Sequence, residues 1–249
     1  MIIELPEVDS TNNYAKLHSE MTAGDVVVAH RQTGGRGQRG NSWEAEPGKN
    51  LTFSVVVEPR ELRAVDQFQL SMAVALAVRN ALAPLLPDSD SLCVKWPNDI
   101  YHRNRKLGGI LIENSLRASM IARSIIGVGI NVNQIVFRNA GPNPVSMAML
   151  TGRETPLRPL LERLSEAIKG VVDMVAEPAG LRSAYLRHLW RRNGIYGWRL
   201  PDGTRLSASI AGVTPEGYLL LQDAADGNVT AYNLKEVFAD IAVAAEPPL

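Results

Sequence analysis

The chain has few cysteines and histidines, the residues that form disulfides and bind structural metal ions. It contains one cysteine, Cys93, in 249 residues, which excludes an internal disulfide. Cys93 stands in the apolar stretch 92–94, so we expect a buried structural thiol. The four histidines show no ligand spacing, and we therefore expect no zinc held by protein side chains.

The chain also has no excess of charge of either sign and no long apolar run. Lys plus Arg and Asp plus Glu are equal at 26 each, so no overall basic field would hold nucleic acid by counterion release. No uninterrupted apolar run has the length of a membrane span, and Glu4 and Glu7 interrupt the segment that a signal peptide would need. We expect a cytoplasmic protein without a membrane segment.

The composition that is present is typical of a folded globular protein. Hydrophobic residues make up 45% and charged residues 21%, which excludes disorder, collagen and a simple coiled coil as overall classes. After residues 192–194 the pattern changes to short strands separated by turns at 201–203 and 215–217. We predict a large domain over 1–192 and a small all-β domain over 193–249, most simply a barrel.

The large domain is predicted to mix strands and helices. A first helix begins at Ser10 or Thr11, either of which can cap it, and carries Tyr14 and Leu17 inward. An alanine-rich stretch predicts a helix at 65–82, an apolar stripe predicts one at 157–175, and another helix is predicted at 181–190. Strands are predicted at 25–29, which is β-branched, at 51–57, which has a period of two, and at 92–96, 107–113 and 124–130. In the small domain the predicted strands are 195–200, 205–213, 218–222, 229–232 and 237–241.

The stretch GGRGQRG at 34–40 contains the glycine spacing of a dinucleotide-binding loop. No helix follows it, because the chain runs through the turn pair at 47–48 into a strand with a period of two. Asn41 stands where a P-loop needs its lysine. The spacing therefore predicts neither nucleotide fold, but a flexible anion-binding loop that carries Arg36 and Arg39 between two strands.

Other short stretches each have a simple structural interpretation when taken alone. D-S-T-N at 9–12 is typical of a helix cap. K-W-P-N-D at 95–99, followed by R-K-L-G-G-I-L-I-E at 105–113, is typical of a hairpin with a charged turn. G-V-G-I-N-V-N at 127–133 is typical of a buried strand whose glycines allow tight packing.

Taken together and in this order, these motifs and the G-R-G loop resemble the biotin protein ligase family over nearly the whole chain. The resemblance implies an α/β (α+β) catalytic domain related to class II aminoacyl-tRNA synthetases, with a mixed sheet and packed helices, followed by a small SH3-like β-barrel. Because D-S-T-N begins at Asp9, it implies the form without an N-terminal DNA-binding domain. The implied activity uses ATP and Mg²⁺ to make biotinyl-5′-adenylate, and then biotinylates a lysine of a biotin carboxyl carrier protein, such as that of acetyl-CoA carboxylase.

The resemblance also implies roles for particular residues. Lys106 and Arg36 match the catalytic pair, with Lys106 between the biotin carboxyl and the α-phosphate and Arg36 closing over them. The magnesium ion is expected on the ATP phosphates, near Asp99 and Asn131. The positions that match biotin-binding residues are Ser10, Thr11, Asn12, Gln32, Arg36, Gly37, Gln38, Lys106, Gly108 and Gly109, and those that match ATP-binding residues are Arg39, Trp43, Asn98, Asp99 and Asn131.

The chain departs from the family pattern at two places. Gln38 stands where the family often has another arginine, which leaves open how firmly the intermediate is held. L-K-E-V at 234–237 replaces the usual glycine-glutamate-valine, so no role is predicted for residues of the small domain. The alternative functions are a lipoate or octanoate ligase of the same fold and a nucleic-acid-binding protein, which the balanced charge disfavours. The expected partner is the carrier protein, without nucleic acid or membrane, and a homodimer is left open.

Overall fold

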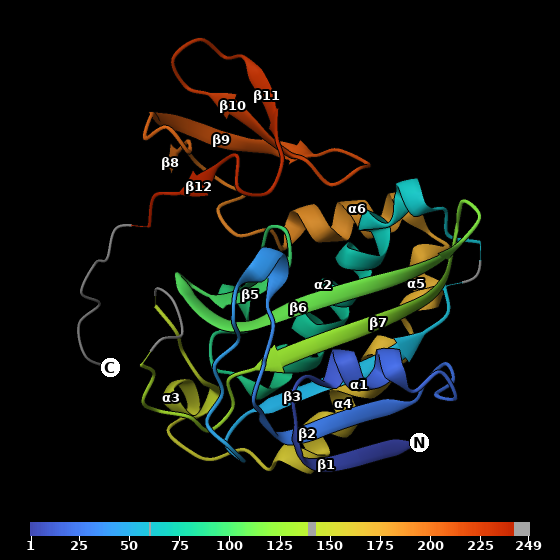
Figure 1. Cartoon of the computed structure of the whole chain (residues 1–249). Coiled ribbons are helices and arrows are strands. Elements are labelled where there is room, and N and C mark those ends of the chain that lie inside the picture. Colours follow the sequence, from blue (N-terminus) through green and yellow to red (C-terminus); the bar gives the residue numbers. More distant parts are fainter. Residues whose placement is uncertain (60, 139–142, 242–249) are drawn as a thin grey trace.

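The large domain is built on one twisted sheet of seven strands (Figure 1). The computed structural model describes residues 1–59, 61–138 and 143–241. The strand order is β1-β2-β3-β7-β6-β5-β4, in which β1 and β2 are parallel and the other neighbours antiparallel, as predicted for a mixed sheet. The strands are β1 (Ile2–Val8), β2 (Val26–Gln32), β3 (Leu51–Val57), β4 (Leu92–Lys95), β5 (Asp99–His102), β6 (Arg105–Arg117) and β7 (Met120–Ile130).

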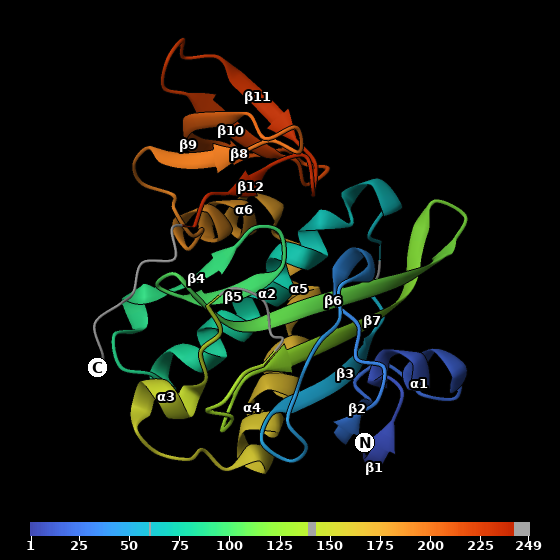
Figure 2. The ribbon, with the colours of Figure 1, turned by 60° about the vertical axis from the view of Figure 1, so that its left-hand side comes forward.

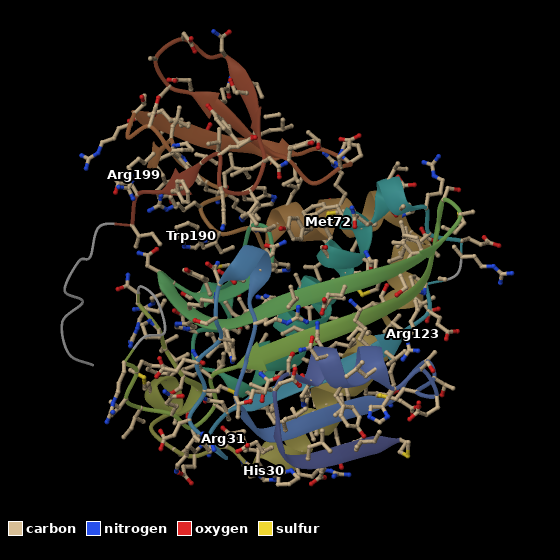
Figure 3. The ribbon with its side chains drawn as sticks, viewed as in Figure 1. His30, Arg31, Met72, Arg123, Trp190 and Arg199 are labelled. Atoms are coloured by element: carbon tan, nitrogen blue, oxygen red, sulfur yellow. The ribbon has the colours of Figure 1, made fainter. Side chains whose placement is uncertain are left out.

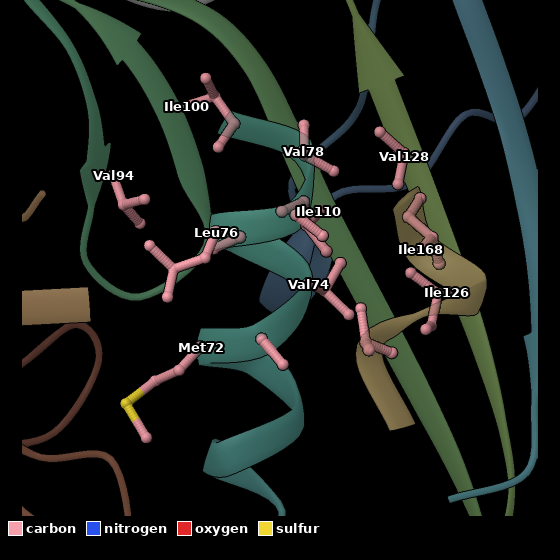
Figure 4. Packing of buried hydrophobic residues seen from close by; sticks show 14 of the residues in the cluster. Met72, Val74, Leu76, Val78, Val94, Ile100, Ile110, Ile126, Val128 and Ile168 are labelled. Atoms are coloured by element: carbon pink, nitrogen blue, oxygen red, sulfur yellow. The ribbon is translucent and has the colours of Figure 1, made fainter. Parts of the chain in front are cut away.

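Helices cover both faces of this sheet because its central strands are apolar on both sides. In β3 every residue is buried: Phe53 and Val55 belong to the main core, whereas Val56 belongs to a smaller core with Ala15. Figure 4 shows Val74 and other side chains of α2 packing against β6 and β7 in the main core. The helices are α1 (Thr11–Leu17) over the smaller core, α2 (Phe68–Leu82), α4 (Leu157–Lys169), α5 (Val171–Val175) and α6 (Pro178–Arg187) over the main core, and α3 (Met147–Thr151).

Two sequence expectations for these elements are wrong in detail, and two strands were not predicted. The predicted helix over 157–175 is interrupted at Gly170, which separates α4 from α5. Leu17 is 82% exposed, because α1 ends there and turns Thr11, Asn12 and Ala15 toward the sheet. The strands β1 and β5 were not predicted, since β1 is an edge strand with interspersed glutamates and β5 is only four residues long.

The small domain is a five-stranded antiparallel sheet that follows α6 in the chain (Figure 2). It is fixed to the large domain by direct contacts. Trp96 Nε1 donates a hydrogen bond of 2.9 Å to the carbonyl of Gly217, and Arg182 donates to the carbonyl of Val213. The sheet order is β11-β10-β9-β8-β12, with β8 (Tyr196–Arg199), β9 (Arg205–Val213), β10 (Leu219–Asp223), β11 (Val229–Tyr232) and β12 (Phe238–Ala239).

Two features bear on the expectations from composition. The segment Phe68–Leu85 is long and apolar enough to cross a membrane by composition alone, but 67% of it is buried inside the protein, where it forms the central helix of the core. Cys93 is half-buried, and its thiol lies 3.5 Å from the carbonyl of Tyr101. Burial raises the pKa of this thiol to about 12, which favours the unreactive, protonated form of a structural cysteine.

Candidate active site

One cavity of about 660 Å³ lies between the sheet, the glycine loop and the small domain. The large domain contributes the start of α1, the loop after β2, the turn between β4 and β5, and the strands β6 and β7. Most of the predicted site residues meet here although they are far apart in sequence. Those that line the cavity are Ser10, Thr11, Asn12, Gln32, Arg36, Gly37, Gln38, Trp43, Asn98, Asp99, Lys106 and Gly109.

A buried polar network fixes the side chains at the start of α1. Ser10 is the N-cap residue, yet its side chain makes no capping hydrogen bond, contrary to the expected cap, and it lines the cavity instead. The backbone N–H and the hydroxyl of Thr11 donate to Gln32 Oε1, at 2.8 and 3.2 Å. The hydroxyl of Ser54, in β3, lies 2.8 Å from Thr11 Oγ1 and 2.6 Å from Asn12 Oδ1. Because Gln32 uses its oxygen for Thr11, its amide nitrogen is the group that can donate to a ligand.

Glu113 connects this network to the glycine loop, a role that sequence analysis missed. Its Oε2 accepts hydrogen bonds from Asn12 Nδ2 at 2.8 Å and from Arg36 Nη2 at 3.0 Å. The same guanidinium donates to Asn13 Oδ1 at 2.6 Å. Arg36 is therefore tethered to α1 through Asn13 and to β6 through Glu113. The only sequence signal for Glu113 was its place at the end of the R-K-L-G-G-I-L-I-E motif.

The glycine loop closes on itself as a small hairpin. The N–H of Trp43 donates to Gly35 O at 2.9 Å, and the N–H of Gly37 donates to Asn41 O at 2.6 Å. A Cβ at Gly35 would lie 2.6 Å from Trp43 O, so this position requires glycine. Gln38 reaches the cavity, where its buried Oε1 has no hydrogen-bond partner among the residues that the structure describes. The side chain of Arg39 lies outside the described part of the structure, and its role with ATP stays a prediction.

The floor of the cavity is flattened by glycines on β6 and β7. A Cβ at Gly129 would lie 2.4 Å from the indole of Trp43, and one at Gly109 would lie 3.4 Å from the same ring. Trp43 therefore rests directly on the sheet. Gly127 makes room for Asn12 in the same way, because a Cβ there would lie 2.3 Å from Asn12 Oδ1. These glycines are needed for close approach.

Gly108 does not share the role that the resemblance implied for it. A Cβ at Gly108 would lie 2.6 Å from Ile130 Cδ1 and 2.8 Å from the carbonyl of Gly129. Gly108 is buried and does not line the cavity, whereas its neighbour Gly109 does. Adjacent residues of a strand face opposite sides of the sheet, so only one of the two glycines can leave room for a ligand.

Charged groups are concentrated where β4, β5 and β6 meet the cavity. Lys106 Nζ lies 2.8 Å from Asp99 Oδ1 and 5.6 Å from the centre of the Trp43 ring. On the other side, Lys95 Nζ lies 4.0 Å from Asp99 Oδ2. Burial lowers the pKa of the Lys95 ammonium, and the positive charges of Lys106 and Arg191 lower it further, whereas Asp99 acts in the opposite direction.

The two predicted asparagines hold backbone segments in place. Asn98 Nδ2 donates to Ile110 O, while the N–H of Ile110 donates to Asn98 O at 3.0 Å, which clamps the turn before β5 onto β6. Asn131 is only 3% exposed and does not line the cavity. Its Nδ2 donates to the carbonyls of Val145 and Lys106, at 3.1 and 3.3 Å. Asn131 thus braces the strand that carries Lys106, and contact with ATP or its metal ion stays a prediction.

The small domain completes one end of the cavity, although sequence analysis assigned it no role. Figure 3 shows Trp190 and Arg199 where the two domains meet. The sequence signal was weak because the 234–237 segment departs from the family pattern. The residues that line this end are Tyr101 and Trp190 of the large domain and, from the small domain, Trp198, Arg199, Ile210, Leu219, Leu234, Lys235, Val237, Phe238, Ala239 and Ile241.

Comparison with known sequences places the same region in one family. Residues 5–131 match the model of the biotin/lipoate A/B protein ligase family. The chain is 33% identical over 169 residues to the biotin–[acetyl-CoA-carboxylase] ligase of Paracoccus denitrificans, covering 66% of this chain and 69% of that protein. It is 37% identical over 153 residues to the bifunctional ligase/repressor BirA of Escherichia coli, covering 60% of this chain but only 45% of that protein. The match thus spans less than half of the bifunctional relative.

Solved structures agree over almost the whole chain, the small domain included. The biotin protein ligase from Aquifex aeolicus, in complex with biotin and ATP, superposes with a TM-score of 0.77 at 24% identity, covering 95% of this chain and 97% of that one. The biotin protein ligase from Leishmania major, in complex with biotinyl-5-AMP, gives a TM-score of 0.65 at 25% identity, covering 93% and 98%. Motifs, fold and sequence identity lead to one conclusion: the chain belongs to the biotin protein ligase family.

Proposed function

We propose that this protein uses ATP to join biotin to a lysine of a biotin carboxyl carrier protein, through biotinyl-5′-adenylate. The observation that carries the proposal is that a fixed polar network and a cationic centre share one cavity. The names of relatives support it, because the Paracoccus denitrificans protein is a biotin–[acetyl-CoA-carboxylase] ligase and the Aquifex aeolicus structure holds biotin and ATP.

The α1 end of the cavity suits the bicyclic ring of biotin. The ureido group of biotin offers two N–H donors and one carbonyl acceptor, so its site needs both kinds of partner. The hydroxyls of Ser10 and Thr11 and the amide nitrogen of Gln32 supply them, while Leu111, which has the same orientation on β6 as Gly109, provides an apolar wall. A mainly apolar pocket with a few fixed polar groups is the usual design of a small-molecule site.

The centre of the cavity suits the adenylation step. A biotin carboxylate oxygen forms a bond to the α-phosphorus of ATP, and the bond to pyrophosphate breaks, so negative charge accumulates at the point of attack. Lys106 is held there by Asp99, and Arg36 reaches the same cavity from the loop. Cations held in place before the reaction stabilise such charge without a reorganisation cost. In the second step the amine of the carrier lysine attacks the acyl carbon, and AMP leaves.

Magnesium is proposed to arrive with ATP rather than to occupy a protein-built site. Among the residues that the structure describes, no group of three or more His, Cys, Asp or Glu side chains could hold a metal ion. Asp99 is the single carboxylate among the described residues that line the cavity. Mg²⁺ is commonly held by one or two carboxylates together with substrate phosphates, which fits this arrangement. The ion would neutralise phosphate charge, and Asp99 is the side chain placed to approach it.

Mass spectrometry of a carrier domain tests the proposal directly. The purified protein, a biotin carboxyl carrier domain and Mg-ATP are incubated in parallel with biotin, lipoic acid or octanoic acid. We expect one biotin added to the carrier lysine and no modification with the other two acids, which lack the ureido group. Modification by lipoate or octanoate in place of biotin would support the alternative ligase function.

We further propose that the carrier domain, and not nucleic acid, is the macromolecular partner. The equal numbers of acidic and basic residues support this, since sequence-independent DNA affinity depends on a basic surface. A sequence-selective gel shift at physiological salt, with or without biotin, would contradict it. Cytoplasmic localisation and a homodimer stay predictions, which fractionation and light scattering can check.

A further inference from the structure

The cavity carries more positive charge than the two reacting groups, the biotin carboxylate and the α-phosphate, require. The whole protein has equal numbers of acidic and basic residues. The described residues that line the cavity nevertheless include five cationic side chains and one carboxylate, Asp99. A concave surface with one sign of charge concentrates ligands of the opposite sign. The cationic residues are Arg36, Lys95, Lys106, Arg199 and Lys235.

The positions of these cations along the cavity indicate what kind of anion it can bind. Arg36 is tethered to Glu113 near the α1 end, and Lys106 is paired with Asp99 at the centre. Lys95 lies beyond Asp99, and the end formed with the small domain adds two more cations. The positive charge therefore extends past the place where the carboxylate and the α-phosphate would meet, which suits an anion with several charged groups.

Lys95 is the strongest of these candidates, because it is held inside the cavity but weakly paired. It is the last residue of β4, and its side chain is only 26% exposed. Its Nζ lies 4.0 Å from Asp99 Oδ2, too far for a hydrogen bond, and 5.4 Å from the centre of the Tyr101 ring. Burial lowers the pKa of this ammonium, so an incoming anion would relieve an unfavourable charge.

We propose that Lys95 binds the β- and γ-phosphates of the nucleoside triphosphate and holds pyrophosphate as it departs. The proposal rests on the proposed function and assigns a further substrate contact to the same cavity. When the carboxylate oxygen bonds to the α-phosphorus, the electron pair of the broken bond passes to a pyrophosphate oxygen. An ammonium near that oxygen stabilises the leaving group, whereas Lys106 acts at the α-phosphate. Arg199 lies at the same end of the cavity and can assist.

The loss of Lys95 would have different effects if its role were purely structural. If Lys95 only positioned Asp99 and Tyr101, its loss would disturb Lys106 through Asp99 and would affect every substrate and both half-reactions. If it binds phosphate, its loss should affect ATP and pyrophosphate selectively. Transfer from preformed biotinyl-5′-adenylate involves no pyrophosphate and should be spared.

The experiment compares Lys95→Gln with Lys95→Arg, which keeps the charge. Lys49→Gln is the matched control, because Lys49 pairs with Glu154 outside this cavity. The readouts are biotin-dependent exchange of labelled pyrophosphate into ATP, product inhibition by pyrophosphate, and transfer of biotin from synthetic adenylate to a carrier domain. For Lys95→Gln we expect the KM for ATP and the inhibition constant for pyrophosphate to rise on the order of 10- to 100-fold, the range for loss of a charged hydrogen bond. The KM for biotin and the transfer rate should change little, and Lys95→Arg should restore most of the loss.

Two outcomes would overturn the proposal. One is a folded Lys95→Gln protein whose inhibition constant for pyrophosphate matches that of the parent, and the other is an equal loss in transfer and in exchange. If the parent shows no biotin-dependent exchange, the proposed function itself fails. Calorimetric titration with pyrophosphate alone then decides about Lys95, because parent and Lys95→Gln should still differ in affinity. If Lys95→Gln is unfolded, the same titration is made with Lys95→Met.

Discussion

Replacing Lys106 with glutamine tests the centre of the proposed mechanism. Lys106 Nζ lies 2.8 Å from Asp99 Oδ1, and its side chain is 27% exposed at the cavity wall. Glutamine retains most of the length but removes the charge and the ion pair. If this charge acts on the transition state, the adenylation step should slow about 10²- to 10³-fold, the range seen when one preorganised stabilising group is lost.

Folding should suffer much less from the same substitution. The ion pair of Lys106 is partly exposed, with Asp99 at 17%, and such pairs contribute about 1 kcal/mol or less to the free energy of unfolding. The cation also lies 5.6 Å from the Trp43 ring, at the outer limit of a weak cation–π contact. We therefore expect the melting temperature to fall by about 2 to 4 °C at most.

The assay is biotin-dependent pyrophosphate release in a single turnover, with the melting temperature measured on the same preparations. Lys49→Gln again serves as control, because it loses an exposed ion pair with Glu154 and no contact with the cavity. If Lys106→Gln stays within about threefold of the parent rate, less than about 1 kcal/mol in the barrier, Lys106 is an ordinary surface lysine. The site assignment would then be wrong at its centre.

Further predictions concern the network, the loop and Lys95. Gly127→Ala places a methyl group 2.3 Å from Asn12 Oδ1. The KM for biotin should therefore rise at least tenfold, and the protein should lose about 1 to 3 kcal/mol of stability. An unchanged KM would contradict the predicted biotin pocket. Glu113→Gln removes the counterion of Arg36. Brief trypsin treatment without substrates should then cut after Arg36 several-fold faster than in the parent. Equal cleavage rates would count against a stabilising contact between Arg36 and Glu113. Lys95→Met should raise the melting temperature at pH 7, because burial lowers the pKa of Lys95 and its charged form destabilises the fold. Above that lowered pKa the folded protein loses the Lys95 proton while the unfolded chain still binds it, so the parent becomes more stable and the gain from Lys95→Met should shrink as the pH rises. The same gain in melting temperature at pH 7 and pH 10 would refute the argument.

The sequence was sufficient for features that depend on local pattern. A period of two predicted β3, the apolar stretch 124–130 predicted β7, and the short strands after residue 194 predicted the five-stranded antiparallel sheet. The ordered motifs then identified side chains that the fold brings to one cavity, such as Thr11, Gln32 and Lys106. Residue type and order along the chain carry this information, so no tertiary contact was needed to infer it.

Features that depend on strand register could not be predicted in the same way. Gly108 and Gly109 are neighbours in one motif, but the pleat turns Gly108 toward Ile130 and Gly109 toward Trp43. Ser54 is an ordinary residue of an apolar strand until β3 is paired with its neighbours and α1 lies over it. The contact between Glu113 and Asn12 joins residues 101 positions apart and follows only from the tertiary fold.

The cations of the site have counterions from the protein itself, and this arrangement favours substrates with several charges. Glu113 occupies Arg36, and Asp99 occupies Lys106. A single carboxylate offers Arg36 little that Glu113 does not already provide, so we expect biotin alone to shift this arginine only weakly. A triphosphate brings enough negative charge to engage Lys95 and Lys106 together while Asp99 is still present between them. Because a ligand shifts a conformation only by its differential affinity for the two states, movement of the Arg36 loop should require both substrates rather than biotin alone.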